Sequence, residues 1–160
     1  MNLIVGLGNP GERYKNNRHN VGQLVIDEIK KKKNLGLKAA KSDKFMNDSG
    51  TFVSKKIKKL KTDPRDLYVV HDDLDIKLGE YKIQFGKGPR DHNGLKSIDK
   101  ELGTDQYWHI RVGVDNRDLE NRTKGEDYVL QDFSEDEKSI LEETIKTLLF
   151  DFNKNYLNKN

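Results

Sequence analysis

The stretch Leu3-Ile-Val-Gly-Leu-Gly-Asn-Pro-Gly11 decides the fold of this chain, because it joins a short apolar run to a bend with three glycines. The apolar run, Leu3–Val5, is typical of a buried strand. Gly6, Gly8 and Gly11 allow the backbone to turn sharply, and they leave room for a ligand to approach the chain. The stretch therefore predicts a strand that ends in a ligand-binding bend.

The segment after this bend carries one histidine, in Arg18-His-Asn20, immediately before an amphipathic helix. One face of that helix is apolar except for its glutamate and comprises Val21, Leu24, Val25, Glu28 and Ile29. The strand, the bend and the helix are expected to place Asn9 and His19 near one end of a sheet. In open α/β sheets, ligands bind at that end.

The composition is that of one domain with a modest core and a strongly charged surface. Of 160 residues, 33% are hydrophobic and 36% are charged, so we expect a single domain over residues 1–160. The absence of cysteine excludes disulfides and thiol catalysis and fits a reducing cytoplasm. No apolar stretch is long enough to span a membrane, and a strand that starts at Asn2 or Leu3 leaves no room for a signal peptide. We therefore expect a cytoplasmic protein.

The positive charge is concentrated in the first part of the chain. The net charge is +3 overall, but it is +9 over residues 1–100 and −6 over residues 101–160. Such an asymmetry indicates either a surface that faces a polyanion or a solvated, lysine-rich surface. Charge alone does not separate these two interpretations.

The rest of the chain alternates predicted strands and helices, which indicates an α/β fold. The predicted strands are Leu67–His71, Tyr81–Phe85 and Trp108–Val114, with no more than a stub of strand at Leu37–Lys41. A second helix starts at Asp48 or Ser49 and is stopped by Thr62-Asp63-Pro64, and a third covers Gly94–Leu102. A last helix follows the capping box Ser134–Glu137, with Ile140, Leu141, Ile145, Leu148, Leu149 and Phe152 on one stripe. Two loops, Gly86–Asn93 and Asp115–Glu126, connect these elements, and Tyr128–Leu130 is ambiguous.

His19 is the strongest candidate for acid–base chemistry, because it lies in a polar segment between a glycine-rich bend and a helix. The acidic segment His71-Asp-Asp-Leu-Asp75 follows the most convincing internal strand. It could bind a metal ion, it could supply Asp72 to orient His19 and raise its basicity, or it could be a solvated turn. The spacing of the residues leaves these three interpretations open.

Three asparagines, Asn9, Asn47 and Asn93, fall at the ends of predicted strands or loops. Their amide groups could hold a peptide backbone or a developing oxyanion, although Asn47 and Asn93 could equally be helix caps or turn residues. The chain has no cysteine and no Gly-x-Ser-x-Gly elbow, so a hydrolase on this scaffold would use water activated by His19.

The glycine spacing also matches the dinucleotide-binding fingerprint Gly-x-Gly-x-x-Gly. Two features argue against the interpretation that the chain is a nucleotide-dependent oxidoreductase. The helix starts only near Val21, well after Gly11, and no acidic residue ends a strand about twenty positions further on.

Seven segments occur together and in order, and as a set they closely resemble bacterial-type peptidyl-tRNA hydrolases. They are Gly6-Leu-Gly-Asn-Pro-Gly11, Tyr14, Arg18-His-Asn20, Phe45-Met-Asn-Asp-Ser-Gly50, His71-Asp-Asp-Leu-Asp75, His92-Asn-Gly-Leu-Lys96 and Ile110-Arg-Val-Gly113. The resemblance runs from Leu3 to about Phe133. It implies one α/β domain with a mixed, largely parallel central sheet and helices on both faces.

The resemblance also implies hydrolysis of the ester between a peptide and the 3′ end of a tRNA, with no metal and no cofactor. By the same resemblance, His19 is the general base that takes a proton from water, and Asp72 holds it in its basic form. Asn9 reads the first peptide carbonyl next to the ester, which a free aminoacyl-tRNA lacks. Tyr14, Phe45, Asn47 and Asn93 line the substrate channel.

The expected partner is the 3′ end and acceptor arm of peptidyl-tRNA, with no membrane and no obligate protein partner, and the family implies a monomer. Candidate phosphate contacts are Arg111, Lys82, Lys87, Arg90 and Lys96, which would make binding depend on salt. A catalytically inactive RNA-binding protein on the same fold is the alternative.

The sequence departs from the family pattern in three places. Only Leu37–Lys44 remains where a hairpin is usual, so we expect a sheet without that pair of edge strands. Pro89 fixes φ and removes a donor in a loop that is usually rich in glycine, so this loop should be stiffer. Asp73 stands where glutamate is common, which should matter little.

Overall fold

Five strands form one mixed sheet in the computed structural model, which describes residues 1–157. The strands are β1 (Leu3–Gly6), β2 (Lys38–Lys41), β3 (Leu67–Lys77), β4 (Tyr81–Phe85) and β5 (Trp108–Asp115). Their order across the sheet is β2-β1-β3-β5-β4. All neighbouring strands are parallel except β4, which pairs antiparallel with β5 at one edge. The predicted mixed, largely parallel sheet is therefore confirmed.

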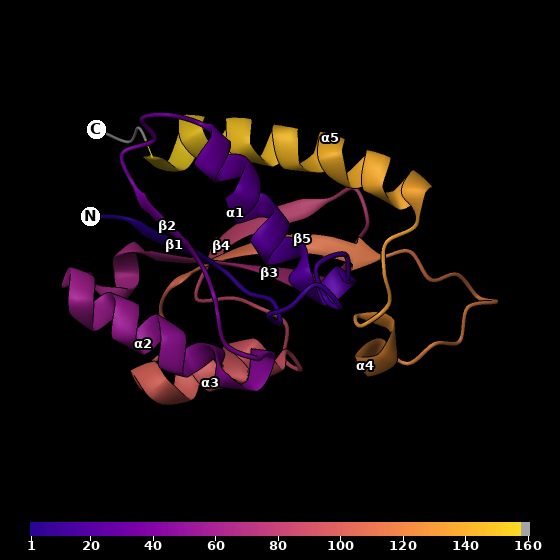
Figure 1. Cartoon of the computed structure of the whole chain (residues 1–160), viewed down its shortest axis with the longest axis horizontal. Coiled ribbons are helices and arrows are strands. Elements are labelled where there is room, and N and C mark those ends of the chain that lie inside the picture. Colours follow the sequence, from indigo (N-terminus) through magenta and orange to yellow (C-terminus); the bar gives the residue numbers. More distant parts are fainter. Residues whose placement is uncertain (158–160) are drawn as a thin grey trace.

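Helices cover both faces of the sheet (Figure 1). They are α1 (Val21–Lys31), α2 (Ser49–Leu60), α3 (Asn93–Leu102), α4 (Gly125–Tyr128) and α5 (Glu135–Phe152), with short turns at Arg18–Asn20, Met46–Asp48, Pro64–Asp66 and Asn153–Leu157. The buried side chains of α1 and α5 form one core with Ile4 of β1, whereas α2 and α3 form another core with Leu3 and Val5. The short apolar run is thus buried on both faces, as a central parallel strand requires.

Gly6 and Gly8 of the first bend make room for the chain itself, which corrects, for these two glycines, the prediction that they make room for a ligand. A Cβ at Gly6 would collide with the carbonyl oxygen of Gly22, so this glycine lets α1 pack directly on β1. A Cβ at Gly8 would meet the side chains of Asn20 and Gln23 at 2.8–2.9 Å. Only Gly11 of the three has a positive φ, of 102°, and it supplies the turn.

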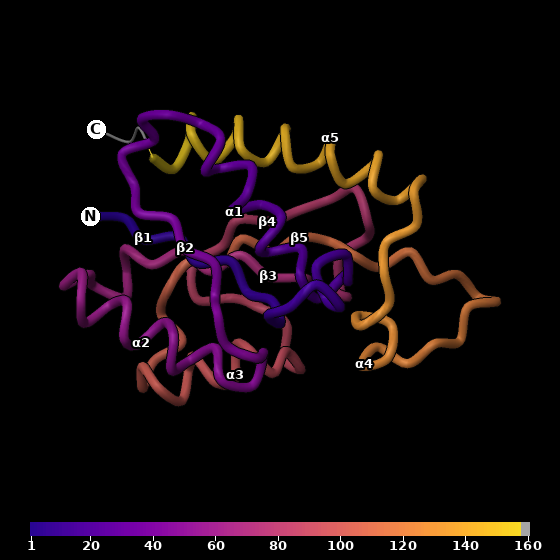
Figure 2. The backbone as a smooth tube through the Cα atoms, viewed as in Figure 1, coloured from indigo at the N-terminus to yellow at the C-terminus, as the bar shows by residue number. Residues whose placement is uncertain are grey.

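The topology creates a crevice at the carboxyl ends of β1 and β3. The chain leaves β1 for β2 on one side through α1, and then crosses to β3 on the other side through α2. This reversal is the switch point at which open α/β sheets bind ligands. The path can be followed in Figure 2, where the segment between β5 and α4 projects from the body of the molecule.

Most predicted elements are confirmed, with four differences. β3 continues through the acidic segment to Lys77, so the predicted strand end at His71 is wrong. The ambiguous segment around Tyr128 belongs to the short helix α4, which begins inside the predicted loop. The predicted apolar stripe of α5 is buried except for Ile140, which is 45% exposed. The third helix starts at Asn93, one residue before the predicted Gly94, and its cap is His92.

Two other predictions concern the short edge strand and the start of α5. Between α1 and the turn at Met46–Asp48, the described chain contains only β2, in line with the expected loss of an edge hairpin. Ser134 and Glu137 form the predicted capping box. Among residues 1–157, no helix combines the length and the apolar character needed to cross a membrane.

Candidate active site

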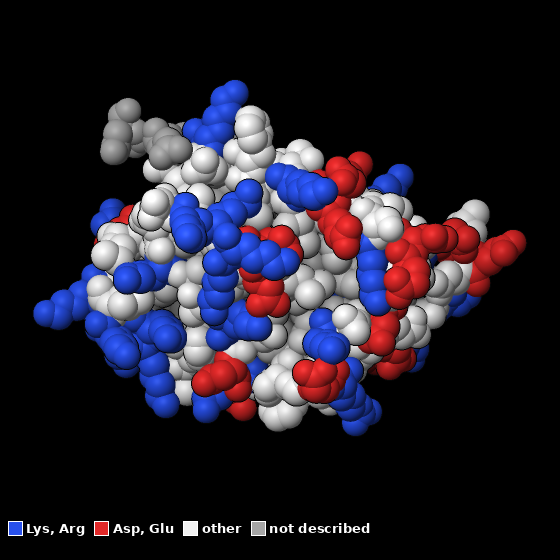
Figure 3. Space-filling view, turned by 45° about the horizontal axis from the view of Figure 1, so that its top comes forward, with Lys and Arg blue, Asp and Glu red and all other residues white. Residues whose placement is uncertain are grey.

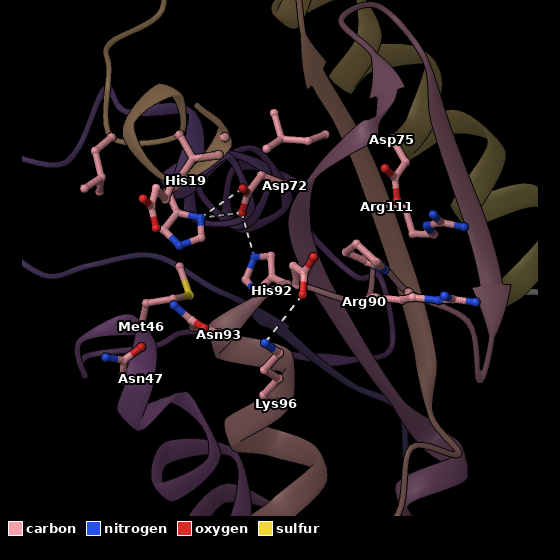
Figure 4. A pocket seen from close by; sticks show the side chains of 18 of the residues that line it. His19, Met46, Asn47, Asp72, Asp75, Arg90, His92, Asn93, Lys96 and Arg111 are labelled. Carbon is pink, nitrogen blue, oxygen red and sulfur yellow. Dashed lines mark hydrogen bonds and ion pairs between the residues drawn. The ribbon is translucent and has the colours of Figure 1, made fainter. Parts of the chain in front are cut away.

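A cleft of 1290 Å³ opens at the carboxyl ends of β1 and β3. The predicted site residues that line it are Asn9, His19, Phe45, Asn47, Asp72, Lys87, Arg90, Asn93, Lys96 and Arg111. Tyr14 and Lys82 are not among its lining residues. Figure 4 shows the labelled side chains converging from several elements, with His19 and Asp72 facing each other.

His19 and Asp72 form a hydrogen-bonded pair inside the cleft. His19 lies in the turn before α1, and its Nδ1 is 2.9 Å from both carboxylate oxygens of Asp72 on β3. Because a carboxylate only accepts, Nδ1 must donate, and Nε2 of the neutral ring then carries the free lone pair. Burial lowers the pKa of His19, but the charge of Asp72 and its hydrogen bond outweigh burial, so the pKa is raised. The pair therefore presents a basic ring nitrogen.

A second histidine, His92, also bonds to Asp72, a role that its motif alone did not indicate. Its Nε2 lies 2.8 Å from Oδ1 of Asp72, and both side chains are almost fully buried. Its Nδ1 accepts from the backbone N–H of Leu95 at the start of α3, which leaves the proton on Nε2. Burial alone would raise the pKa of Asp72, but the two imidazoles hold it well below its usual range. Asp72 is thus an ionised acceptor shared by two rings.

The acidic segment is not a solvated turn. Asp72 and Asp73 are 2% and 1% exposed, and Asp73 accepts from Nε of Arg111 at 2.7 Å. His71 points away, with its Nδ1 on the carbonyl oxygen of Asp72 at 2.9 Å and its Nε2 on Nδ1 of His109 at 3.1 Å. Burial lowers the pKa of His71, and burial with the charge of Arg111 lowers the pKa of His109 to about 4. Both rings are therefore neutral structural groups.

Within residues 1–157, Asp72 of this segment belongs to a group that could hold a metal ion, together with His19 and His92. One ligand atom from each lies within 4.8 Å of the others. In the structure, Nδ1 of His19 and Nε2 of His92 donate to the carboxylate of Asp72. An ion bound through these two nitrogens would have to replace both hydrogen bonds.

Asn9 is held so that its amide nitrogen remains available. Its Oδ1 accepts from the backbone N–H of Met46 at 2.7 Å, which fixes which end of the amide faces the protein. Its backbone is clamped by Asn20, which accepts from the Asn9 N–H and donates to the Asn9 carbonyl, each at 2.9 Å. The sequence analysis did not assign Asn20 a role, although its position beside His19 placed it close to the bend. The free Nδ2 of Asn9 is a donor for a ligand.

The other predicted channel residues lie around this pair. Asn47 is exposed in the turn before α2, and Asn93 is the first residue of α3. The caps of α2 and α3 are Asp48 and His92, so the alternative that either asparagine is a helix cap is wrong. The rings of Tyr14 and Phe45 pack edge to face with centroids 6.2 Å apart, and Phe45 is 56% exposed.

The segment around α4 is anchored to the turn that carries His19. The backbone N–H of His19 donates to the carbonyl oxygen of Val129 at 2.8 Å. Next to it, Arg18 forms a 2.8 Å ion pair with Glu137 of α5, donates to two backbone carbonyls and stacks on Tyr128. The side chains of Arg18 and Glu137 are only 7% and 8% exposed. These contacts fix the position of His19 relative to one wall of the cleft.

The candidate phosphate contacts differ in their position relative to the cleft and in the partners that their side chains already have. Lys87, Arg90 and Lys96 line the cleft, and Nζ of Lys96 lies 3.7 Å from Oδ1 of exposed Asp91. Arg111 is 6% exposed, and it donates to Asp73 and to Gln84, each at 2.7 Å. Lys82 is exposed on the edge strand β4 outside the lining of the cleft.

Comparisons with known proteins agree with the resemblance seen in the sequence. The model of a family described as peptidyl-tRNA hydrolase matches residues 3–157. A peptidyl-tRNA hydrolase of Aliarcobacter butzleri is 41% identical over 162 residues, which cover 91% of this chain and 87% of the relative. One from Arthrobacter sp. is 39% identical over 160 residues, which cover 87% of this chain and 81% of the relative. A crystal structure of the enzyme from Acinetobacter baumannii matches with a TM-score of 0.79 and 25% identity, over 91% of this chain and 83% of that one.

Proposed function

The chain belongs to the peptidyl-tRNA hydrolase family, and we propose that it hydrolyses the peptide–tRNA ester with a water molecule that His19 deprotonates. The hydrogen-bonded pair of His19 and Asp72 at the switch point of the sheet carries this proposal, since it provides a basic nitrogen inside a substrate-sized cleft. The hydrolysis of peptidyl-tRNA agrees with every relative named above.

Nε2 of His19 is the base in the proposed mechanism. Water bound at Nε2 loses its proton as its oxygen attacks the ester carbonyl, and the ring becomes an imidazolium. Asp72 stabilises that imidazolium, because Nδ1–H already donates to the carboxylate at 2.9 Å. The proton is then available for the 3′ oxygen of the tRNA as it leaves.

His92 is proposed to keep Asp72 in place. A carboxylate held only by His19 could rotate, whereas the second bond, from Nε2 of His92, fixes Oδ1. His92 is in turn fixed at the start of α3 by its bond with the backbone N–H of Leu95. Its position therefore depends on the fold of α3 rather than on bound substrate.

Asn9 is proposed to select substrates by donating from Nδ2 to the first peptide carbonyl. The Met46 N–H occupies its Oδ1, so the amide faces the cleft with a donor. A free aminoacyl-tRNA has an ammonium group near this position and no carbonyl acceptor. It would leave the Asn9 donor unpaired, and sites that read a hydrogen-bonding group reject substrates that lack it.

The remaining contacts are assigned by where the side chains lie. Asn47 and Asn93 are proposed to bind the peptide and the 3′-terminal groups, and Phe45 with Tyr14 to form an apolar rim. The phosphate contacts are proposed for Lys87, Arg90 and Lys96 in the cleft, together with Lys82 and Arg111. We also propose that the enzyme acts as a monomer in the cytoplasm, where its tRNA substrate is found; light scattering tests the monomer.

The decisive experiment measures release of peptide from an N-blocked aminoacyl-tRNA in the presence of EDTA. The wild-type protein is expected to release peptide, and His19→Ala to lose turnover by 10²-fold or more while it still binds tRNA. Gln23→Ala is a matched control, because Gln23 lies in α1, four residues after His19, and within residues 1–157 its side chain donates only to the carbonyl oxygen of Ser42.

Three other results of this experiment would each change the proposed function. Equal turnover by wild type and His19→Ala would remove His19 from the mechanism. Loss of wild-type turnover on adding EDTA would indicate a metal at His19, Asp72 and His92. Binding of tRNA without release of peptide by any variant would make the protein an inactive RNA-binding member of the family.

A further inference from the structure

The solvent-facing side of α2 carries a set of lysines that the site described above does not use. Four of them, Lys55, Lys56, Lys58 and Lys59, lie within α2, and Lys61 follows its last residue. The opposite side of the helix is buried against α3 and the sheet, where the backbone N–H of Gly50 donates to the Ser97 hydroxyl. The lysine side is exposed or half-buried. In Figure 3, Lys and Arg gather toward the end of the molecule where α2 lies in Figure 1, and Asp and Glu toward the other end.

Within residues 1–157, these lysines have no acidic partners, whereas several lysines of α1 and α5 do. Lys31 pairs with Glu28 and Lys138 with Glu135, each three residues away. α2 contains no acidic residue, and none of its lysines forms an ion pair in the described chain.

The spacing of the α2 lysines also opposes a purely structural role. Lys55 and Lys59 are four residues apart, and Lys56 and Lys59 are three apart, so like charges face each other along the helix. Lysines in the last turn gain from the helix dipole, but Lys55 and Lys56 lie before it. The helix therefore keeps a concentrated positive charge that its own stability does not require.

Three of these lysines line a small cleft, together with Lys44 from the segment before α2. It measures 250 Å³ and is lined by Asp43, Lys44, Phe52, Lys55, Lys56 and Lys59. Lys56 Nζ lies 5.4 Å from the centre of the Phe52 ring, which forms an apolar base. Lys44 directly precedes Phe45, which lines the catalytic cleft, so consecutive residues of one short segment line the two clefts.

We propose that Lys44, Lys55, Lys56 and Lys59 form a second RNA-binding surface that holds backbone phosphates of the tRNA outside the catalytic cleft. This inference rests on the proposed function. Of the two parts of the substrate, the tRNA carries a negative charge on every nucleotide, whereas the charge of the peptide varies with its sequence. A lysine surface that serves every substrate molecule therefore matches the tRNA. Phosphate contacts of this kind add affinity without reading sequence.

The test compares two triple variants that remove the same charge. Lys55→Gln/Lys56→Gln/Lys59→Gln changes the surface. The control, Lys138→Gln/Lys146→Gln/Lys154→Gln, changes half-buried Lys138 and exposed Lys146 of α5, and exposed Lys154 of the turn after it. Binding of deacylated tRNA is measured by anisotropy between 50 and 200 mM salt. The α2 variant is expected to bind about tenfold more weakly at 100 mM salt, with the slope of log K against log salt reduced by about 2 to 3. The control is expected to change much less, and the thermal midpoint of the α2 variant should not fall.

Hydrolysis locates the effect on the substrate. On N-blocked aminoacyl-tRNA, the α2 variant should show a KM raised about tenfold and an unchanged kcat. On an N-blocked aminoacyl ester of the trinucleotide CCA, which has no tRNA body, it should match wild type.

Three results would overturn the inference. Equal tRNA binding by the two triple variants would show that the α2 lysines make no specific contact. An equal loss on the trinucleotide ester would place the effect in the catalytic cleft. A loss that follows acidic residues in the peptide would assign the surface to the peptide instead. The anisotropy needs no turnover, so a wild-type protein that binds tRNA through α2 but releases no peptide would refute only the proposed function.

Discussion

Replacing Asp72 by Asn tests the active site most directly, because the two side chains have the same shape and differ in charge and in one acceptor. The carboxylate accepts from Nδ1 of His19 and from Nε2 of His92 at 2.9 and 2.8 Å. An amide offers one oxygen acceptor, and its nitrogen donates. In the variant, either one imidazole loses its acceptor or His19 changes tautomer and carries the proton on Nε2. In the second case, His19 is no longer a base.

The expected loss follows from these bonds. A hydrogen bond to a charged group contributes about 1.5–3 kcal/mol, and every 1.4 kcal/mol is tenfold in rate, so loss of the His19–Asp72 bond in the transition state alone lowers kcat/KM about 10- to 150-fold. A positioned general base contributes about 10²–10⁴-fold, which is the limit if His19 adopts the other tautomer. We therefore expect Asp72→Asn to lower kcat/KM about 10- to 10⁴-fold, with the larger losses if His19 adopts the other tautomer.

The dependence on pH separates this mechanism from general damage. Asp72 raises the pKa of His19 through its charge and its hydrogen bond, whereas burial lowers it. Below that pKa, His19 is protonated and inactive as a base, so kcat/KM of the wild type should rise through a midpoint above 6.5. Asp72→Asn removes both raising effects, so the remaining activity should rise through a midpoint at lower pH than in the wild type.

The assay is peptide release from N-blocked aminoacyl-tRNA between pH 5 and 9. Asp75→Asn is the matched control, because Asp75 is exposed in the same cleft and its carboxylate makes no contact with His19. This control should keep both the rate and the midpoint nearly unchanged. A variant at position 72 with lower activity but the wild-type midpoint would refute the proposed coupling of Asp72 to His19.

Two further changes test specificity and stability. Asn9→Asp keeps the oxygen that accepts from Met46 N–H but replaces the amide donor by a second oxygen. We expect kcat/KM on N-blocked substrate to fall about tenfold or more, and the preference for N-blocked substrate over free aminoacyl-tRNA to become smaller. An unchanged preference would reject the carbonyl-reading role. Glu137→Gln leaves the buried charge of Arg18 without its partner and should lower the free energy of unfolding in urea by about 3 kcal/mol, whereas Glu135→Gln, on a glutamate that is 91% exposed, should change it by less than about 0.5 kcal/mol. Similar urea midpoints for the two glutamate variants would contradict that account of the pair.

Most of the elements, and three residues of the candidate site, could be predicted from the sequence. Apolar runs and caps are local signals, so the capping box at Ser134 and the strand that starts at Leu67 could be predicted from neighbouring residues. The order of strands and helices indicated an α/β sheet with ligands at one end. His19, Asn9 and Asp72 were predicted because their motifs occur together and in order.

The contacts between these residues, and the glycines that allow helix α1 to pack on strand β1, could be identified only from the tertiary structure. The partners of Asp72 are 53 and 20 residues away in the chain, and no local pattern shows that His92 rather than His71 bonds to it. Gly6 contacts α1 because the helix folds back onto β1. The residues of the bend do not specify how closely the helix approaches the strand. The strand continues through Asp72 and Asp73 because buried histidines and Arg111 satisfy their carboxylates. Such polar groups can be buried only when they have hydrogen-bond partners. Here distant segments of the chain supply these partners, and the segments come together only in the folded protein.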